Sequence, residues 1–74
     1  MNKSLALTLR NFRRRAGKTQ SEVSSVVGVG RAAYTKWELG RSRPTIPHLI
    51  LLANYYGVTV DMLLNGGKRG RNAC

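Results

Sequence analysis

Apolar residues recur along this chain at spacings of three and four, which is the period of a helix that buries one face. The pattern predicts a first helix from about Ser4 to Ala16, and Gly17 ends it. The residues expected on its buried face are Leu5, Leu9, Phe12 and Ala16. No segment shows the strict alternation of a strand, so the sequence predicts helices alone.

A capping box predicts where the second helix begins. Thr19 is followed three residues later by Glu22, so each side chain can bond the backbone N–H of the other residue. Val23 and Val27 lie four residues apart and face the core, and Gly28 ends the helix after about two turns. A helix this short depends on its neighbours for stability.

The third helix is expected from about Arg31 to Leu39, and Gly40 closes it. The residues expected to face inward, from the preceding turn onward, are Val29, Ala33, Tyr34 and Trp37. Because two aromatic residues three positions apart share a helix face, Tyr34 and Trp37 are interpreted as core residues rather than as stacking platforms for single-stranded bases.

Two further helices complete the pattern. Thr45 caps the fourth, Pro47 lies in its first turn, and Gly57 ends it. Its expected core face consists of Ile46, Leu49, Ile50, Leu52, Ala53 and Tyr56. Thr59 caps the fifth, where the negative charge of Asp61 suits the first turn. Leu63 and Leu64 are expected to close the core.

The chain of 74 residues has room for one small domain. We expect residues 1–65 to form a compact all-α domain of five helices. Residues 66–74 consist of glycine and charge with almost nothing to bury, and we expect them to form a flexible basic tail. Its Lys68, Arg69 and Arg71 either add phosphate contacts or remain in solvent.

Charge narrows the class of partner. The 13 Lys and Arg against 3 Asp and Glu give a net charge of +10, which implies nucleic acid or an anionic membrane. A membrane span needs about 20 apolar residues in a row, and the longest run here is Leu49 to Ala53. The N-terminal residues also lack the continuous apolar stretch of a signal peptide. We therefore expect a cytoplasmic protein that does not use a membrane.

Histidine and cysteine, two residue types that often carry out catalysis or bind metals, each occur once. His48 is the single histidine and Cys74 the single cysteine, so neither a metal set nor an internal disulfide is expected. A lone histidine also makes a nucleophilic triad an unfavoured interpretation. We expect no enzyme activity, no catalytic residue, no cofactor and no small-molecule substrate.

A set of short motifs extends from the second helix to the fifth: Thr19-Gln20, Glu22-Val23, Gly28-Val29, Trp37-Glu38, Gly40, Pro44, Leu49, Leu52-Ala53, Gly57-Val58, Asp61 and Leu63-Leu64. Together they resemble the pattern of the Cro/phage-repressor (XRE-type) helix-turn-helix family. They match without a gap from about Leu5 to Leu64. The resemblance implies a lambda-repressor-like domain that binds double-stranded operator DNA, commonly as a homodimer, and regulates transcription. The short chain favours a compact Cro-like or restriction-controller protein, in the role of a repressor.

The resemblance also implies residue roles. Gln20 falls where the family holds a phosphate, at a helix start whose N–H groups favour anions. Arg13 and Glu38 occupy the places of a family ion pair. The positions that correspond to the outward face of the recognition helix are Gly30, Arg31, Ala32, Thr35 and Lys36.

Several details of DNA contact stay open in the sequence. Arg31 can bond a guanine edge or a phosphate, and Ala32 can pack on a thymine methyl or simply allow close approach. Arg41 and Arg43 are expected to meet phosphates, which adds affinity and salt dependence without sequence information. Gly30 replaces the usual hydroxyl cap and offers backbone only.

A possible protein interface completes the sequence picture. Leu51, Tyr55 and Met62 stand where the family pattern tends to be polar, and we expect them to build a dimer or partner surface. Two alternative functions remain open at this point. One is an antitoxin-type adaptor that uses the fold mainly to hold a protein, and the other is a small basic RNA-binding protein.

Overall fold

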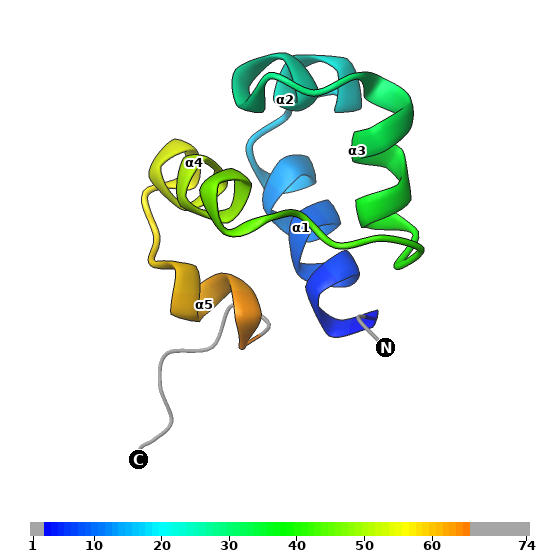
Figure 1. The fold of residues 1–74 in the computed structure, drawn as a ribbon. Coiled ribbons are helices and arrows are strands. Elements are labelled where there is room, and N and C mark those ends of the chain that lie inside the picture. The colour runs from blue at the N-terminus through cyan, green and yellow to red at the C-terminus, as the bar shows by residue number, and fades with distance from the viewer. Residues whose placement is uncertain (1–2, 66–74) are drawn as a thin grey trace.

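The computed structural model describes residues 3–65, apart from the side chains of Lys3 and Ser4, and that part of the chain contains five helices and no strand. The helices are α1 (Lys3–Arg15), α2 (Gln20–Val27), α3 (Arg31–Glu38), α4 (Ile46–Tyr56) and α5 (Val60–Leu64) (Figure 1). This confirms the predicted all-α fold. The predicted flexible tail, residues 66–74, lies outside the described residues.

The predicted helix boundaries hold because their local chemistry is present. Thr19 Oγ1 accepts the N–H of Glu22, and the Glu22 carboxylate accepts the N–H of Thr19 at 2.8 Å, so the capping box is complete. Thr59 caps α5 through the N–H of Met62 at 3.1 Å. Gly28 ends α2 with a φ of 75°, a left-handed conformation that favours glycine.

One predicted cap is absent. Thr45 stands at the N-cap of α4, yet its side chain makes no capping bond. Its hydroxyl instead lies 2.9 Å from Nδ1 of His48. The His48 ring packs against Trp37, with ring centroids 5.1 Å apart. The beginning of α4 is therefore anchored to α3 by an aromatic contact, which the sequence alone did not predict.

The helices enclose one core. α1 packs against α3 and α5, α2 against α3 and α4, and α4 against α5. Figure 1 shows α1 between α3 and the α4–α5 pair. Each helix supplies one large side chain that is fully buried: Leu9, Val23, Tyr34, Leu52 and Leu63. Because every helix contributes, none of the short helices has to be stable in isolation.

Several residues predicted for the core are exposed. The exposed fractions are 64% for Ile46, 48% for Ile50 and 43% for Leu64, and Ala16 and Ala33 are exposed as well. Ala16 follows the last residue of α1, and Ile46 and Leu64 lie at helix ends, where no neighbouring helix covers them. Conversely, Ala6 and Thr8 of α1 are buried although the sequence pattern did not mark them.

The contrast between Leu63 and its neighbour gives a direct test of this core. We expect Leu63→Ala to lower the free energy of unfolding by about 2–5 kcal/mol, because the fully buried side chain leaves a cavity between the helices. Leu64→Ala, at a position with 43% exposure, should change it by about 0.5 kcal/mol or less. Urea denaturation of both variants measures the difference, and equal losses would contradict the burial described here.

Candidate nucleic-acid interface

One face of α3 is exposed to solvent, and the other face is buried against the rest of the domain. Tyr34, Trp37 and Glu38 are buried, whereas Arg31, Ala32 and Lys36 are exposed. With about 100° between successive residues, Ala32 and Lys36 lie near the centre of the exposed face and Arg31 on its border. The sequence analysis placed Ala33 inward, but it is exposed, so two alanines rather than one lie on the exposed side of α3.

The turn before α3 leaves the backbone accessible. Gly30 is exposed and is the N-cap of α3, and it provides no side-chain cap. The first N–H groups of a helix have no intrahelical acceptor, so at this end of α3 they stay available to a polar ligand. The predicted role of Gly30, backbone contact alone, is therefore possible at this position.

A surface hollow of about 500 Å³ lies beside this end of α3. Its lining residues are Arg13, Lys18, Thr19, Gln20, Ser21 and Arg31. The capping box uses the N–H groups of Thr19 and Glu22, which leaves those of Gln20 and Ser21 without an intrahelical acceptor. Because Arg13 is already paired with Glu38, it is Lys18, Arg31 and these two N–H groups that make the hollow suited to an anion such as phosphate.

Glu38 joins three helices at the base of this surface. Its residue is only 3% exposed, and Arg13 of α1 donates to both of its oxygens, from Nε at 2.7 Å and from Nη2 at 3.0 Å. The structure therefore contains the ion pair that the family resemblance implied. The Tyr34 hydroxyl also donates to this carboxylate, and so does Gln20 Nε2 of α2, at 3.1 Å. Two of these four bonds come from residues that the sequence analysis did not connect with Glu38.

The amide of Gln20 is oriented by this network. Its Nε2 faces Glu38, and its Oε1 lies 3.0 Å from the Thr35 hydroxyl. A flipped amide would set Oε1 against the carboxylate, so the orientation follows from charge. Nε2 carries two hydrogens, and only one points at Glu38, which leaves the second for an outside acceptor such as a phosphate.

Thr35 is half-buried and its hydroxyl is used within the protein. The oxygen lies 2.8 Å from the Arg31 carbonyl oxygen and 3.0 Å from Gln20 Oε1. A hydroxyl has one hydrogen, so it donates to one of these oxygens at a time. Towards solvent, Thr35 therefore offers its methyl group and its oxygen lone pairs rather than a free donor.

The electrostatics of Glu38 keep it ionised. Burial alone would raise the pKa of its carboxyl group, but the hydrogen bonds from Arg13, Tyr34 and Gln20 hold that pKa below its ordinary value. The Glu38 hydrogen bond raises the pKa of Arg13 in turn. Burial, followed by the bond to Glu38, raises the pKa of Tyr34 far above its ordinary range, so its hydroxyl remains a donor.

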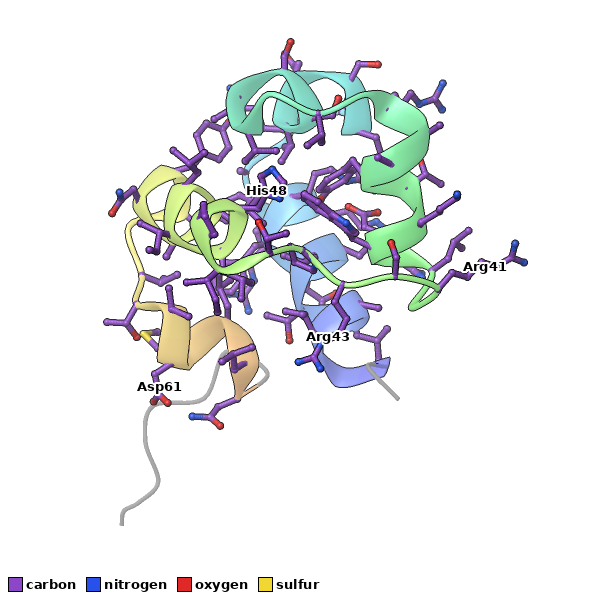
Figure 2. All side chains as sticks on the ribbon, viewed as in Figure 1. Arg41, Arg43, His48 and Asp61 are labelled. Carbon is purple, nitrogen blue, oxygen red and sulfur yellow. The ribbon has the colours of Figure 1, made fainter. Side chains whose placement is uncertain are left out.

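The loop after α3 carries two further cations. Arg41 and Arg43 are both exposed. Figure 2 shows that they leave the loop in different directions, with Arg41 projecting beyond the end of α3. The structure thus does not gather the two arginines into one cluster, and Arg41 is the one that lies beside the end of α3.

The predicted protein interface is only partly exposed. Leu51 on α4 is 42% exposed, as expected. Tyr55 is half-buried and packs edge-to-face on Tyr56, with ring centroids 5.1 Å apart, and Met62 is half-buried too. Because the protein itself covers part of Tyr55 and Met62, the three residues do not form one uniformly exposed patch.

Other kinds of site find little support in this part of the chain. Within residues 3–65, no group of three or more His, Cys, Asp or Glu side chains is placed to hold a metal ion. The helices of that same range also lack the length and apolar character needed to cross a bilayer. The surface beside α2 and α3 is the strongest candidate for a functional site because a cationic hollow adjoins an exposed helix face there.

Two short helices joined by a glycine turn, with one anchored and one open face on the second, are the structural elements of a helix-turn-helix protein. The chain belongs to the helix-turn-helix family, whose model matches residues 9–63. This match includes α2, α3, the turn between them and the helices that support them.

Three curated relatives of this chain are named as regulators of transcription. The chain is 34% identical over 58 residues to the SPbeta prophage-derived uncharacterized HTH-type transcriptional regulator YonR of Bacillus subtilis, covering 78% of this chain and 54% of that protein. It is 37% identical over 54 residues to the HTH-type transcriptional activator BcrR of Enterococcus faecalis, covering 70% and 26%. It is 31% identical over 55 residues to the cryptic phage CTXphi transcriptional repressor RstR of Vibrio cholerae, covering 74% and 49%. The aligned part thus spans about half the length, or less, of these curated relatives.

Removal of the Glu38 carboxylate tests its structural role. Glu38→Ala removes two of the hydrogen bonds of Arg13 and the acceptor of the Tyr34 hydroxyl, and we expect a loss of about 3 kcal/mol in the free energy of unfolding. Glu22→Ala is the control, because it removes an exposed carboxylate of the capping box and should cost clearly less stability than Glu38→Ala. Thermal melting that left Glu38→Ala as stable as the parent would contradict this assignment.

The lowered pKa of Glu38 also predicts a pH dependence. A carboxyl group whose pKa is depressed on folding adds stability above its ordinary value of 4.5, and this stability is lost as the pH falls towards the depressed value. Melting temperatures measured between about pH 6 and pH 3 should therefore fall less steeply for Glu38→Gln than for the parent. Glu22→Gln corrects for the second carboxyl with a lowered pKa. Parallel curves for Glu38→Gln and the parent would exclude Glu38 as the source.

Proposed function

We propose that this chain is a sequence-specific regulator that binds double-stranded DNA and places α3 in the major groove. One observation carries the proposal: the exposed face of α3, with Arg31, Ala32 and Lys36, adjoins a cationic hollow at the beginning of α2. A helix start with cations beside it can hold a phosphate, while the exposed helix face reaches base edges. The net charge of +10 supports the same partner.

Each exposed residue has a role that its chemistry allows. Arg31 bonds a guanine edge or a phosphate, and Lys36 donates to the groove or to a phosphate. Ala32 packs on a thymine methyl. The second hydrogen of Gln20 Nε2 and the N–H groups at the start of α2 fix the protein to the backbone. Thr35 positions Gln20 and adds a methyl contact.

The two loop arginines supply affinity without reading the sequence. Arg41 and Arg43 are exposed, and we propose that they meet phosphates on either side of the groove that α3 enters. Such contacts release counterions, so binding should weaken steeply as salt rises.

We further propose that two copies bind a two-fold operator, with their α3 helices in successive major grooves about 34 Å apart. We favour repression, because covering a promoter requires only the DNA-binding surface. The related RstR is named a repressor and the related BcrR an activator, so the sign of regulation needs its own measurement.

Selection from a random duplex library, followed by gel shifts at two salt concentrations, tests this function. We expect one enriched sequence with two-fold symmetry, bound at least roughly a thousandfold more tightly than scrambled duplex. RNA of matched length should compete only weakly. Equal affinity for enriched and scrambled duplex, or preference for RNA, would refute the proposal in favour of an adaptor or RNA-binding role.

Variants of α3 test the assigned contacts. Arg31→Ala should weaken cognate binding by roughly 10- to 100-fold and relax one operator position if the residue reads a base. Lys36→Ala, if it contacts phosphate, should weaken all duplexes alike and reduce the salt slope by about 1. Arg15→Ala serves as the control. It removes the same charge, but from the side of α1 opposite to Arg13. If the control lost as much as either variant, affinity would depend on net charge alone.

A further inference from the structure

α4 is apolar on both of its faces. Leu49, Leu52 and Ala53 point into the core. The exposed residues Ile46, Pro47, Ile50, Leu51 and Asn54 cover a continuous arc of about 140° on the other side. Four of these five side chains are apolar, and Ile46, Ile50 and Leu51 are 64%, 48% and 42% exposed. We call these five residues the outer face of α4.

Such a face is unusual for a helix on a surface. A helix that meets water normally carries polar residues opposite its core side, and a helix apolar all round is normally covered. Burial of an exposed isoleucine or leucine against a partner is favourable, because it removes apolar surface from water. The outer face of α4 therefore has a physical reason to be covered by a partner.

Charge indicates which partner. All Lys and Arg residues of the described range lie between residues 3 and 43, and α4 and α5 carry none. The only ionised side chain on these two helices is Asp61, at the opposite edge of the molecule from Arg41 (Figure 2). DNA gains nothing from such a neutral face, because its phosphates require cations.

We propose that the outer face of α4 is the contact with a second copy of this chain. A two-fold contact places the same face against itself, so two molecules of charge +10 can meet here without setting cations against cations. This inference rests on the proposed function in one respect, that a two-fold operator requires two copies.

The size of the face sets the expected strength. The 11 residues of α4 span about 16 Å, so the contact is much smaller than the roughly 800 Å² per partner of a standard interface. The free dimer should therefore be weak, with a dissociation constant on the order of 100 μM, and DNA with two half-sites should favour it. The exposed apolar area of the face comes from Ile46, Ile50 and Leu51 rather than from the half-buried Tyr55 and Met62.

Sedimentation equilibrium of the whole chain without DNA, from about 10 μM to 1 mM, measures this contact. Ile50→Glu places a carboxylate in the apolar contact, and we expect the dissociation constant to rise by at least roughly tenfold. Leu7→Glu on α1 is the matched control, because Leu7 is 52% exposed and lies on another helix. It should leave the dissociation constant within about twofold.

Ile46→Glu provides a second variant if circular dichroism shows that Ile50→Glu has lost helix, since Ile46 is the more exposed residue. A parent chain that stays monomeric at 1 mM would overturn the proposal. So would dissociation by Leu7→Glu with no effect of the α4 variants. A duplex with one half-site separates the two proposals: the α4 variants should bind it like the parent, because α3 is unchanged. If the parent binds no duplex specifically, the DNA function fails while the association result stands.

Discussion

The buried carboxylate of Glu38 holds together the surface for which we propose DNA binding. A charge that is 3% exposed is tolerated only where donors surround it, and here the donors come from α1, α2 and α3 itself. Arg13 and Gln20 must both reach Glu38, the last residue of α3. The beginning of α2 and the end of α3 are therefore held in place relative to α1. The cationic hollow and the exposed face of α3 lie side by side for this reason.

The same network explains why polar residues near the surface do two tasks. Gln20 gives one amide hydrogen to Glu38 and keeps the other for solvent, and its oxygen faces Thr35. The hydrogen bonds that orient Gln20 are made before any ligand arrives, so its free donor points in a set direction. Such preorganisation lowers the entropic cost of a phosphate contact.

The described cations are confined to one part of the chain. Residues up to 43 carry every described cation, and the α4–α5 part carries the exposed isoleucines. One half of the domain is therefore suited to an anionic polymer and the other to an uncharged protein surface. In the dimer that we propose, this division keeps like charges away from the shared contact.

The sequence by itself determined the five helices, the capping box of α2, the glycine ends and most of the core, because these depend on local hydrogen bonds and on the 3.6-residue period. Family resemblance added the Arg13–Glu38 pair. Only the tertiary structure decided which apolar residues are covered. Ile46, Ile50 and Leu64 fit a helical core pattern, yet no other helix lies over them. The bonds of Gln20 to Glu38 and to Thr35 join α2 to α3, whose residues become neighbours only after packing, so no local signal predicts them. Tyr34 and Glu38 lie four residues apart on α3, so their bond follows from helix geometry.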